Sequence, residues 1–447
     1  MTSSPTKSAG TSADNNERGK AHMASQTLAE GRSFRDPEIQ RCPFAFYKEL
    51  RDAAPVYWDP EIMCYVVSRY RTNQEILRDT ATFSNIGIVE PPMPSPATPI
   101  ATDIRNTTYP SVPMLVTNDP PQHTEFRRIS NGIMTARLMR AMEPMIDETA
   151  VRRVDAMVAK GGGDFISEYA VPLPIEVISA LLGMPAEMAV KCKEWSDALI
   201  EPLSGMVSEE REIECAHQFV ERQQYFAAEI ERIRSVGGPP EHLITGIALA
   251  RTADGELFSM AEALALIEQY MIAGTETTTN ALGMGVLLMI QRPDLAEAIR
   301  ADPAKVTVFV EEVLRLFGPV QGEFRVVARD TRVDGVDIPA GSKIMLRLGA
   351  ANRDDRVYEM ADDVDLDRRI PRSHLAFGSG VHTCQGTPLA RLELASTFGV
   401  FAERVGTVRV DGDAGGVVYA ESILHIGLAK MPLVMTPADA AHVSQSP

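Results

Sequence analysis

One segment of thirteen residues constrains the fold and chemistry of this chain more than any other. Residues 374–386 read HLAFGSGVHTCQG, so three glycines surround the lone Cys384, and the helix-forming run PLARLE follows. Glycines at 378 and 380 allow the backbone to pass close to a flat ligand. Cys384 then precedes a helix N-terminus, where backbone N–H groups and the helix dipole stabilise a thiolate. Such a thiolate can ligate iron or act as a nucleophile, whereas a single cysteine without this context is usually a small buried hydrophobic residue.

The segment resembles the haem-ligand loop of the cytochrome P450 family, whose signature is F-G-x-G-x-H-x-C-x-G. Every fixed position is met from Phe377 to Gly386. The resemblance implies that Cys384 is the proximal thiolate ligand of haem b, with Phe377, Gly378 and Gly386 in the haem-binding loop. It also implies a mostly α fold with small β-sheets, in which the haem lies between a long distal helix and the proximal Cys-loop helix.

A long helix is expected before residue 292. Ser259 and Glu262 form a capping box in front of an apolar stretch that ends at Arg292-Pro293. Inside it, residues 273–278 read AGTETT, and a hydroxyl beside a carboxylate is costly on an apolar helix unless it is used. The alternative is a threonine that bonds to the preceding turn, next to an exposed glutamate.

The AGTETT run resembles the family's distal helix. By this resemblance Thr277 stabilises bound dioxygen and Glu276 is its partner in proton relay. Ala273 and Gly274 would leave room for dioxygen beside the haem.

Two further matches concern charged side chains. Glu312 and Arg315 share a helix face and resemble the family's structural E-x-x-R ion pair. Its usual third member is an arginine shortly before the cysteine loop, and here Arg368 and Arg369 both remain possible.

The haem propionates are expected to bind four basic side chains. The segment Asp119-Pro120-Pro121 predicts an N-cap and a helix to about residue 134. His123 and Arg127 lie on one face of this helix. The resemblance assigns them to a propionate, together with Arg325 and His382.

The remaining pattern predicts one domain. Residues 1–33 read as a disordered tail, residues 34–436 as a single P450 domain, and residues 437–447 as a flexible tail. A hairpin is expected over 57–70, a helix from Asp302-Pro303 to Gly318-Pro319, and strands over 324–336, 344–348 and 424–435. Seven prolines between positions 91 and 113 predict a loop without helix or strand, which is either a functional lid or a surface insertion.

Composition excludes several classes of protein. A net charge of −17 argues against nucleic-acid binding. The longest apolar stretch, residues 281–290, is too short to span a bilayer. The cysteines are scattered at positions 42, 64, 192, 215 and 384, which suits the reducing cytosol and gives no zinc motif. We therefore expect a cytoplasmic monomer.

The expected reaction is monooxygenation of a small apolar organic substrate, by hydroxylation or oxidative O-dealkylation. Because the chain has no room for a fused reductase, electrons should come from NAD(P)H through an external reductase and ferredoxin. An acidic ferredoxin would be steered by a basic patch near the cysteine loop; ordinary arginines paired with Glu125 and Glu393 are the alternative. The patch consists of Arg127, Arg128, Arg137, Arg140, Arg372 and Arg391.

Two other functions compete with this one. A peroxide-driven peroxygenase typically lacks the acid–alcohol pair that Glu276 and Thr277 form here, and a haem-based gas sensor would need an output domain. For the substrate, a terpenoid, an aromatic acid or ether and a small steroid all remain open. The predicted pocket residues are Ile86, Ile88, Val89, Tyr109, Val320, Phe324, Leu424 and His425.

Overall fold

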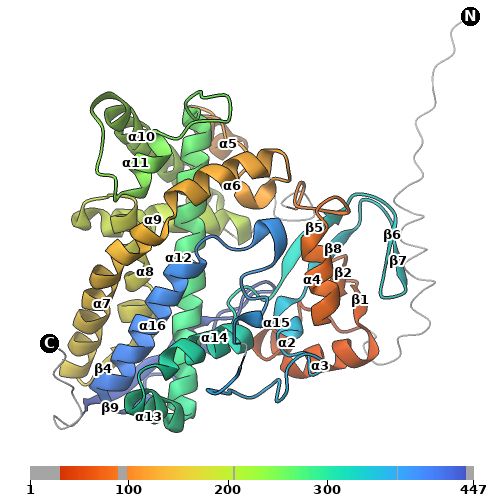
Figure 1. Ribbon diagram of the computed structural model, residues 1–447, viewed down its shortest axis with the longest axis vertical. Coiled ribbons are helices and arrows are strands. Elements are labelled where there is room, and N and C mark those ends of the chain that lie inside the picture. The colour runs from red at the N-terminus through yellow and green to blue at the C-terminus, as the bar shows by residue number, and fades with distance from the viewer. Residues whose placement is uncertain (1–30, 89–97, 205–206, 370, 439–447) are drawn as a thin grey trace, which may run out of the picture.

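Most helices fill one side of the structure, and the largest sheet lies on the other (Figure 1). The computed structural model describes residues 31–88, 98–204, 207–369 and 371–438. The described helices are α2 (Pro37–Arg41), α3 (Phe44–Ala53), α4 (Tyr70–Arg78), α5 (Pro99–Arg105), α6 (Gln122–Ile133), α7 (Ala136–Ala159), α8 (Pro172–Leu181), α9 (Ala189–Ile200), α10 (Glu209–Val236), α11 (Leu243–Ala248), α12 (Met260–Gln291), α13 (Pro293–Ala301), α14 (Lys305–Phe317), α15 (Leu348–Ala351) and α16 (Thr387–Arg404). This confirms the mostly helical fold class.

The largest sheet has five strands in the order β1-β2-β8-β5-β3. Its strands are β1 (Val56–Asp59), β2 (Cys64–Val67), β8 (Lys343–Leu346), β5 (Glu323–Val327) and β3 (Phe83–Ser84). The smaller sheets are β4 (Gly162–Asp164) with β12 (Pro432–Pro437) and β9 (Val405–Val410), β10 (Val418–Tyr419) with β11 (Leu428–Lys430), and β6 (Thr331–Val333) with β7 (Val336–Ile338). The predicted hairpin is confirmed, because β1 and β2 pair antiparallel.

Helix α12 runs through the centre of the helical side (Figure 1). The predicted capping box is present: the Ser259 side chain accepts from the Glu262 N–H, and the Glu262 carboxylate accepts from the Ser259 N–H. Further along, a Cβ placed on Gly285 would lie 2.1 Å from Cζ of Phe398 in α16. Glycine at this position therefore lets α12 and α16 pack closely.

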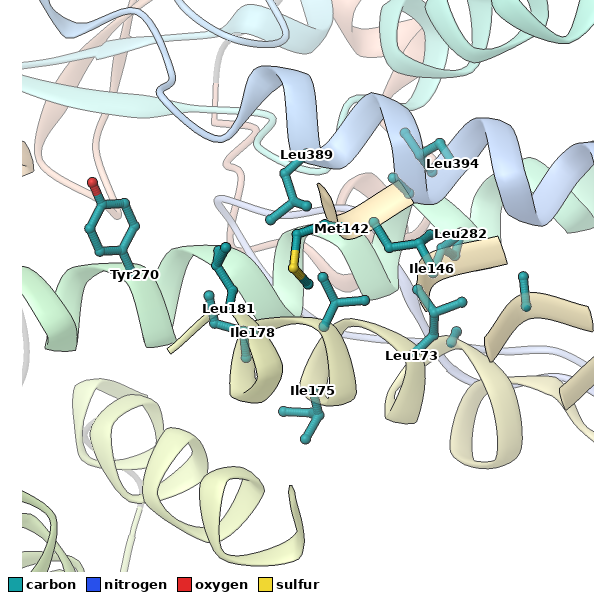
Figure 2. Close-up of a cluster of buried hydrophobic side chains, with 14 of the residues drawn as sticks. Met142, Ile146, Leu173, Ile175, Ile178, Leu181, Tyr270, Leu282, Leu389 and Leu394 are labelled. Carbon is teal, nitrogen blue, oxygen red and sulfur yellow. The ribbon is translucent and has the colours of Figure 1, made fainter. Parts of the chain in front are cut away.

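The main core lies where α7, α8, α12 and α16 meet. Figure 2 shows the side chains that fill it, namely Met142, Ile146, Leu173, Ile175, Ile178, Leu181, Tyr270, Leu282, Leu389 and Leu394. Each is buried. Among the described residues, no helix combines the length and the apolar composition that crossing a bilayer requires.

Two local predictions are wrong. Asp119 does not cap α6 with its side chain, because the N-cap is Pro121. The Asp119 carboxylate instead accepts hydrogen bonds from the Ser84 hydroxyl and the Asn85 N–H. The proline-rich segment does contain a helix, α5: Pro99 occupies its first turn, where proline is tolerated, and the Thr98 side chain caps it.

Contacts with the domain begin before residue 34. Arg32 donates to the Glu49 carboxylate at 2.5 Å, and the Ser33 hydroxyl donates to buried Asp59 at 2.9 Å. At the other end, the Ala438 N–H donates to the Arg404 carbonyl at 3.0 Å.

Candidate active site

The cysteine loop is closed by a hydrogen bond between its two ends. The Cys384 N–H donates to the Phe377 carbonyl at 2.8 Å. Gly378 and Gly380 have φ values of +68° and +77°, in the left-handed region that favours glycine. A Cβ on Gly380 would also lie 2.8 Å from the Leu77 carbonyl oxygen of α4. The loop therefore needs glycine at position 380 to pack against α4, whether or not a ligand also passes close to it.

The Cys384 thiol precedes α16 by three residues, as predicted, and its residue is exposed. Burial by the surrounding protein nevertheless raises the pKa of the thiol. The Gly386 N–H, the Thr387 hydroxyl and the Arg127 charge lower it without cancelling the burial.

Helix α6 connects the cysteine loop to α12. Arg127 donates to the Thr383 carbonyl at 2.6 Å, and the Gln385 amide donates to the Asn131 side chain at 2.9 Å. The Ser130 hydroxyl hydrogen-bonds both Gln385 and Tyr270 of α12. Sequence reasoning missed this bridge, because a serine within a helix gives no signal of its partners.

The four predicted propionate ligands gather beside the cysteine loop. The His123 and His382 rings lie 4.1 Å apart, and His382 Nε2 lies 3.6 Å from the Asp119 carboxylate. Burial and the positive charges of His123 and Arg325 together lower the pKa of His382 to about 4, although Asp119 opposes them. Burial and Arg127 likewise lower the pKa of His123. Buried basic groups that lie close together repel one another when they are charged. An anion bound among them removes this repulsion, so the cluster forms a site for an anion.

Ala273 and Thr277, one turn apart in the middle of α12, form what we call the open face of this helix. Ala273 is exposed and Thr277 half-buried, whereas Thr275 and Thr278 are buried. The Thr277 hydroxyl donates to the Ala273 carbonyl at 2.8 Å, so the back-bonded threonine considered as the alternative is present. A Cβ on Gly274 would lie 3.3 Å from Ile178 of α8, so the small size of this residue serves helix packing.

Glu276 faces the C-terminal turn rather than another helix. Its Oε1 lies 3.8 Å from Nδ1 of His425. His425 forms an antiparallel bridge with Val320, and the Leu424 carbonyl accepts from the Gln321 N–H at 2.7 Å. Two predicted pocket segments are thus joined and lie beside the acid of α12.

The other predicted pocket residues are more dispersed. Phe324 and Leu424 are half-buried against one core cluster. Tyr109 packs against the main core, whereas Ile86 is 56% exposed. Ile88 is half-buried. Val89 lies outside the described residues.

The E-x-x-R pair is fully buried. Arg315 donates to both oxygens of Glu312, at 2.8 and 2.9 Å. Arg368 donates to Glu312 at 2.8 Å, whereas Arg369 is exposed. Arg368 is therefore the third member that the spacing left undecided.

A second buried carboxylate, Glu311, was not anticipated. It accepts from Arg391 at 2.6 and 2.9 Å and lies 2.9 Å from Nε2 of His374. Although burial alone would raise its pKa, His374 and Arg391 lower it to about 2. Because His374 opens the cysteine segment and Arg391 follows it on α16, Glu311 ties both sides of the loop to α14. The doubled glutamate at 311–312 was the signal in the sequence.

The arginines predicted on the proximal face divide into two groups. Arg127 and Arg391 are bonded within the fold, and Arg128 pairs with Glu125 at 2.6 Å. Arg137, Arg140 and Arg372 are exposed, as is Arg128, and Arg372 lies 3.5 Å from the Glu311 carboxylate. Arg128 and Arg137 also line a cavity of about 500 Å³ between α6, α7 and residues 240–251.

The prediction that Glu393 pairs with the surface arginines is wrong. Its side chain is buried in α16 and, within the described part of the chain, its Oε2 has no hydrogen-bond partner. Burial raises the pKa of this carboxyl well above its usual value.

Comparisons with known proteins identify the family of this chain. The family model for cytochrome P450 matches residues 164–401. The vitamin D(3) 25-hydroxylase of Pseudonocardia autotrophica is 36% identical over 330 residues, which cover 73% of this chain and 79% of that protein.

Solved structures show the same fold. Cytochrome P450 CYP109Q5 from Chondromyces apiculatus has a TM-score of 0.80 and 30% identity, covering 92% of this chain and 99% of that one. Cytochrome P450 CREJ in complex with (4-ethylphenyl) dihydrogen phosphate has a TM-score of 0.81 and 29% identity, covering 90% and 100%.

The chain belongs to the cytochrome P450 family. It is a monooxygenase with haem b as its cofactor, and it requires dioxygen, an organic substrate and a redox partner. The site fits haem b, because a cysteine sulfur suits iron and a cluster of buried basic groups suits two propionates. When bound, the haem supplies the redox chemistry that activates dioxygen.

Proposed function

We propose that this monooxygenase hydroxylates or O-dealkylates a small apolar substrate held between α12, the segment 320–324 and the turn 424–425. The bridge between Val320 and His425, with His425 beside Glu276, carries the proposal. It brings predicted substrate contacts next to the predicted oxygen-activating residues. The apolar substrate is supported by a relative whose name gives vitamin D(3) as its substrate.

In this proposal each predicted site residue has one task. Cys384 ligates the iron, and His123, Arg127, Arg325 and His382 hold the propionates. Thr277 positions the proton that the reaction consumes beside the open face of α12, and Glu276 supplies it. Phe377, Gly378 and Gly386 shape the loop around the sulfur, while Ala273 keeps the open face of α12 free of bulk.

The substrate part of the proposal is tested by the haem absorption spectrum of the purified holoprotein. Titration with terpenoids, aryl ethers, aromatic acids and small steroids should give a saturable spectral shift with at least one of these classes. A variant with Leu424→Trp should weaken that shift, because the larger side chain occupies the proposed pocket. Equal shifts in both proteins would exclude the turn 424–425 from the pocket.

We further propose that NAD(P)H is the electron source, and that a separate reductase and an acidic ferredoxin deliver the electrons in the cytosol. Arg137 and Arg140 support this, because both are exposed on α7 and have no ion pair within the described structure. Helix α7 follows directly on α6, which is bonded to the cysteine loop. A local positive patch on a chain of charge −17 would speed association with an acidic partner.

Charge reversal tests the docking surface. The double variant Arg137→Glu/Arg140→Glu should be reduced more slowly by ferredoxin, and more so at low ionic strength, with an unchanged substrate-induced spectral shift. The double variant Arg332→Glu/Arg409→Glu is a matched control on exposed strand positions. Reduction rates that respond neither to the reversal nor to salt would exclude this surface.

A further inference from the structure

The C-terminal turn brings an imidazole to the acid of α12. His425 Nδ1 lies 3.8 Å from Glu276 Oε1, within ion-pair range but longer than a direct hydrogen bond. The His425 side chain is half-buried, with 33% of it exposed. Thr277, the next residue along α12, carries the hydroxyl on the open face.

The backbone holds His425 in this place from two sides. Its bridge with Val320 joins the turn to the segment before β5. Its N–H donates to the Ser422 hydroxyl at 3.1 Å, and the N–H of Ile426, the next residue, donates to the Pro319 carbonyl at 3.0 Å. The imidazole is therefore fixed relative to α12 by main-chain bonds and not by its own side-chain contacts.

We propose that His425 is a positioning residue for proton delivery, which holds the Glu276 carboxylate beside Thr277 and returns to it each proton that it gives up. The proposal rests on the proposed roles of Glu276 and Thr277. In each cycle a protonated His425 gives the Nδ1 proton to the Glu276 carboxylate, and the neutral ring, which keeps its Nε2 proton, takes up a new proton from water at Nδ1. The carboxyl group then releases its proton toward Thr277, so every proton consumed at the site is replaced from solvent.

The charges around His425 suit a group that loses its proton readily. Burial lowers the pKa of the imidazole, the Glu276 carboxylate raises it, and the Arg347 guanidinium lowers it. Arg347 is buried at the end of β8, where it donates to the Tyr47 hydroxyl and the Ile423 carbonyl. Glu276 and Arg347 are the charged groups that act on the ring from the elements packed against it.

The contact is tested by titrating His425 in the diamagnetic ferrous carbon monoxide form of the full holoprotein. NMR of histidine-labelled protein follows the imidazole signals, and His425→Asn identifies the one that belongs to His425. In Glu276→Gln the pKa of His425 should fall, because the carboxylate that raises it is gone. An unchanged titration overturns the proposal, even where His425 variants fold poorly.

The function is tested by dioxygen consumption with NADPH, a ferredoxin and its reductase, which needs no known substrate. His425→Asn should slow consumption about tenfold at neutral pH, flatten its dependence on pH and enlarge the difference between H₂O and D₂O. His217→Asn, at an exposed position on α10, is the matched control and should resemble the wild type. Wild-type pH and isotope behaviour in His425→Asn overturns the proposal.

The two proposals fail in different ways. If the wild type consumes no dioxygen with any ferredoxin, the proposed electron donor is wrong, while the NMR titration still decides the role of His425. If consumption is normal and His425→Asn leaves it unchanged, the proposed electron donor stands and the proposed role of His425 does not.

Discussion

Replacing Glu311 by glutamine removes a buried negative charge from the centre of a network around the cysteine loop. The pKa of this carboxyl falls from its usual 4.5 to about 2 in the fold, because His374 and Arg391 outweigh burial. At 1.36 kcal/mol for each pKa unit, this corresponds to about 3 kcal/mol of folding free energy. The variant also leaves Arg391 and His374 without their common partner, so a loss of about 3–5 kcal/mol is expected.

The dependence on pH follows from the direction of the shift. A lowered pKa stabilises the fold fully above 4.5, and this stabilisation is lost as the pH falls toward 2. The difference between wild type and Glu311→Gln should therefore be constant from pH 8 to about 5 and shrink below 4.5.

Urea unfolding of the holoprotein, followed by far-UV circular dichroism, measures the loss. The reduced carbon monoxide spectrum then reports whether the loop still presents Cys384, and part of the long-wavelength band should disappear in Glu311→Gln. Glu297→Gln, at an exposed position on α13, is the control and should unfold like the wild type. If Glu311→Gln unfolds at the wild-type urea concentration, the network does not stabilise the loop and the reasoning is refuted.

Four further outcomes are expected. Cys384→Ala should abolish the long-wavelength band of the reduced carbon monoxide complex, and its survival would exclude this sulfur as the ligand. Thr277→Ala should still bind haem but divert reducing equivalents to peroxide or water, and an unchanged ratio of peroxide to dioxygen consumed would remove Thr277 from the mechanism. Gly285→Ala should cost about 1–3 kcal/mol in urea unfolding, because its Cβ would lie 2.1 Å from Phe398, and wild-type stability would contradict this. Glu393→Gln should stabilise the protein by about 1–3 kcal/mol at pH 7, since burial raises the pKa of this unpaired carboxyl, and the gain should vanish below pH 4.5.

Local sequence signals determined much of this protein. The capping box at Ser259 and Glu262 predicted where the longest helix begins, because both partners lie within one turn. The glycines around Cys384 predicted a loop whose backbone can pass close to a flat ligand, and the same spacing was sufficient to indicate the family. Both features depend on residues that are neighbours along the chain.

Tertiary structure decided which distant groups become partners. Sequence spacing left Arg368 and Arg369 equal, and the fold alone places Arg368 at 2.8 Å from buried Glu312. The sequence predicted that Asp119 caps a helix, yet its carboxylate accepts hydrogen bonds from Ser84 and Asn85, which are more than thirty residues away in the chain. The approach of His425 to Glu276 likewise spans more than a hundred residues. Periodicity and capping describe one helix or strand at a time, whereas a buried charge selects its partner from everything that packing brings within a few ångströms, and only the folded chain specifies that set.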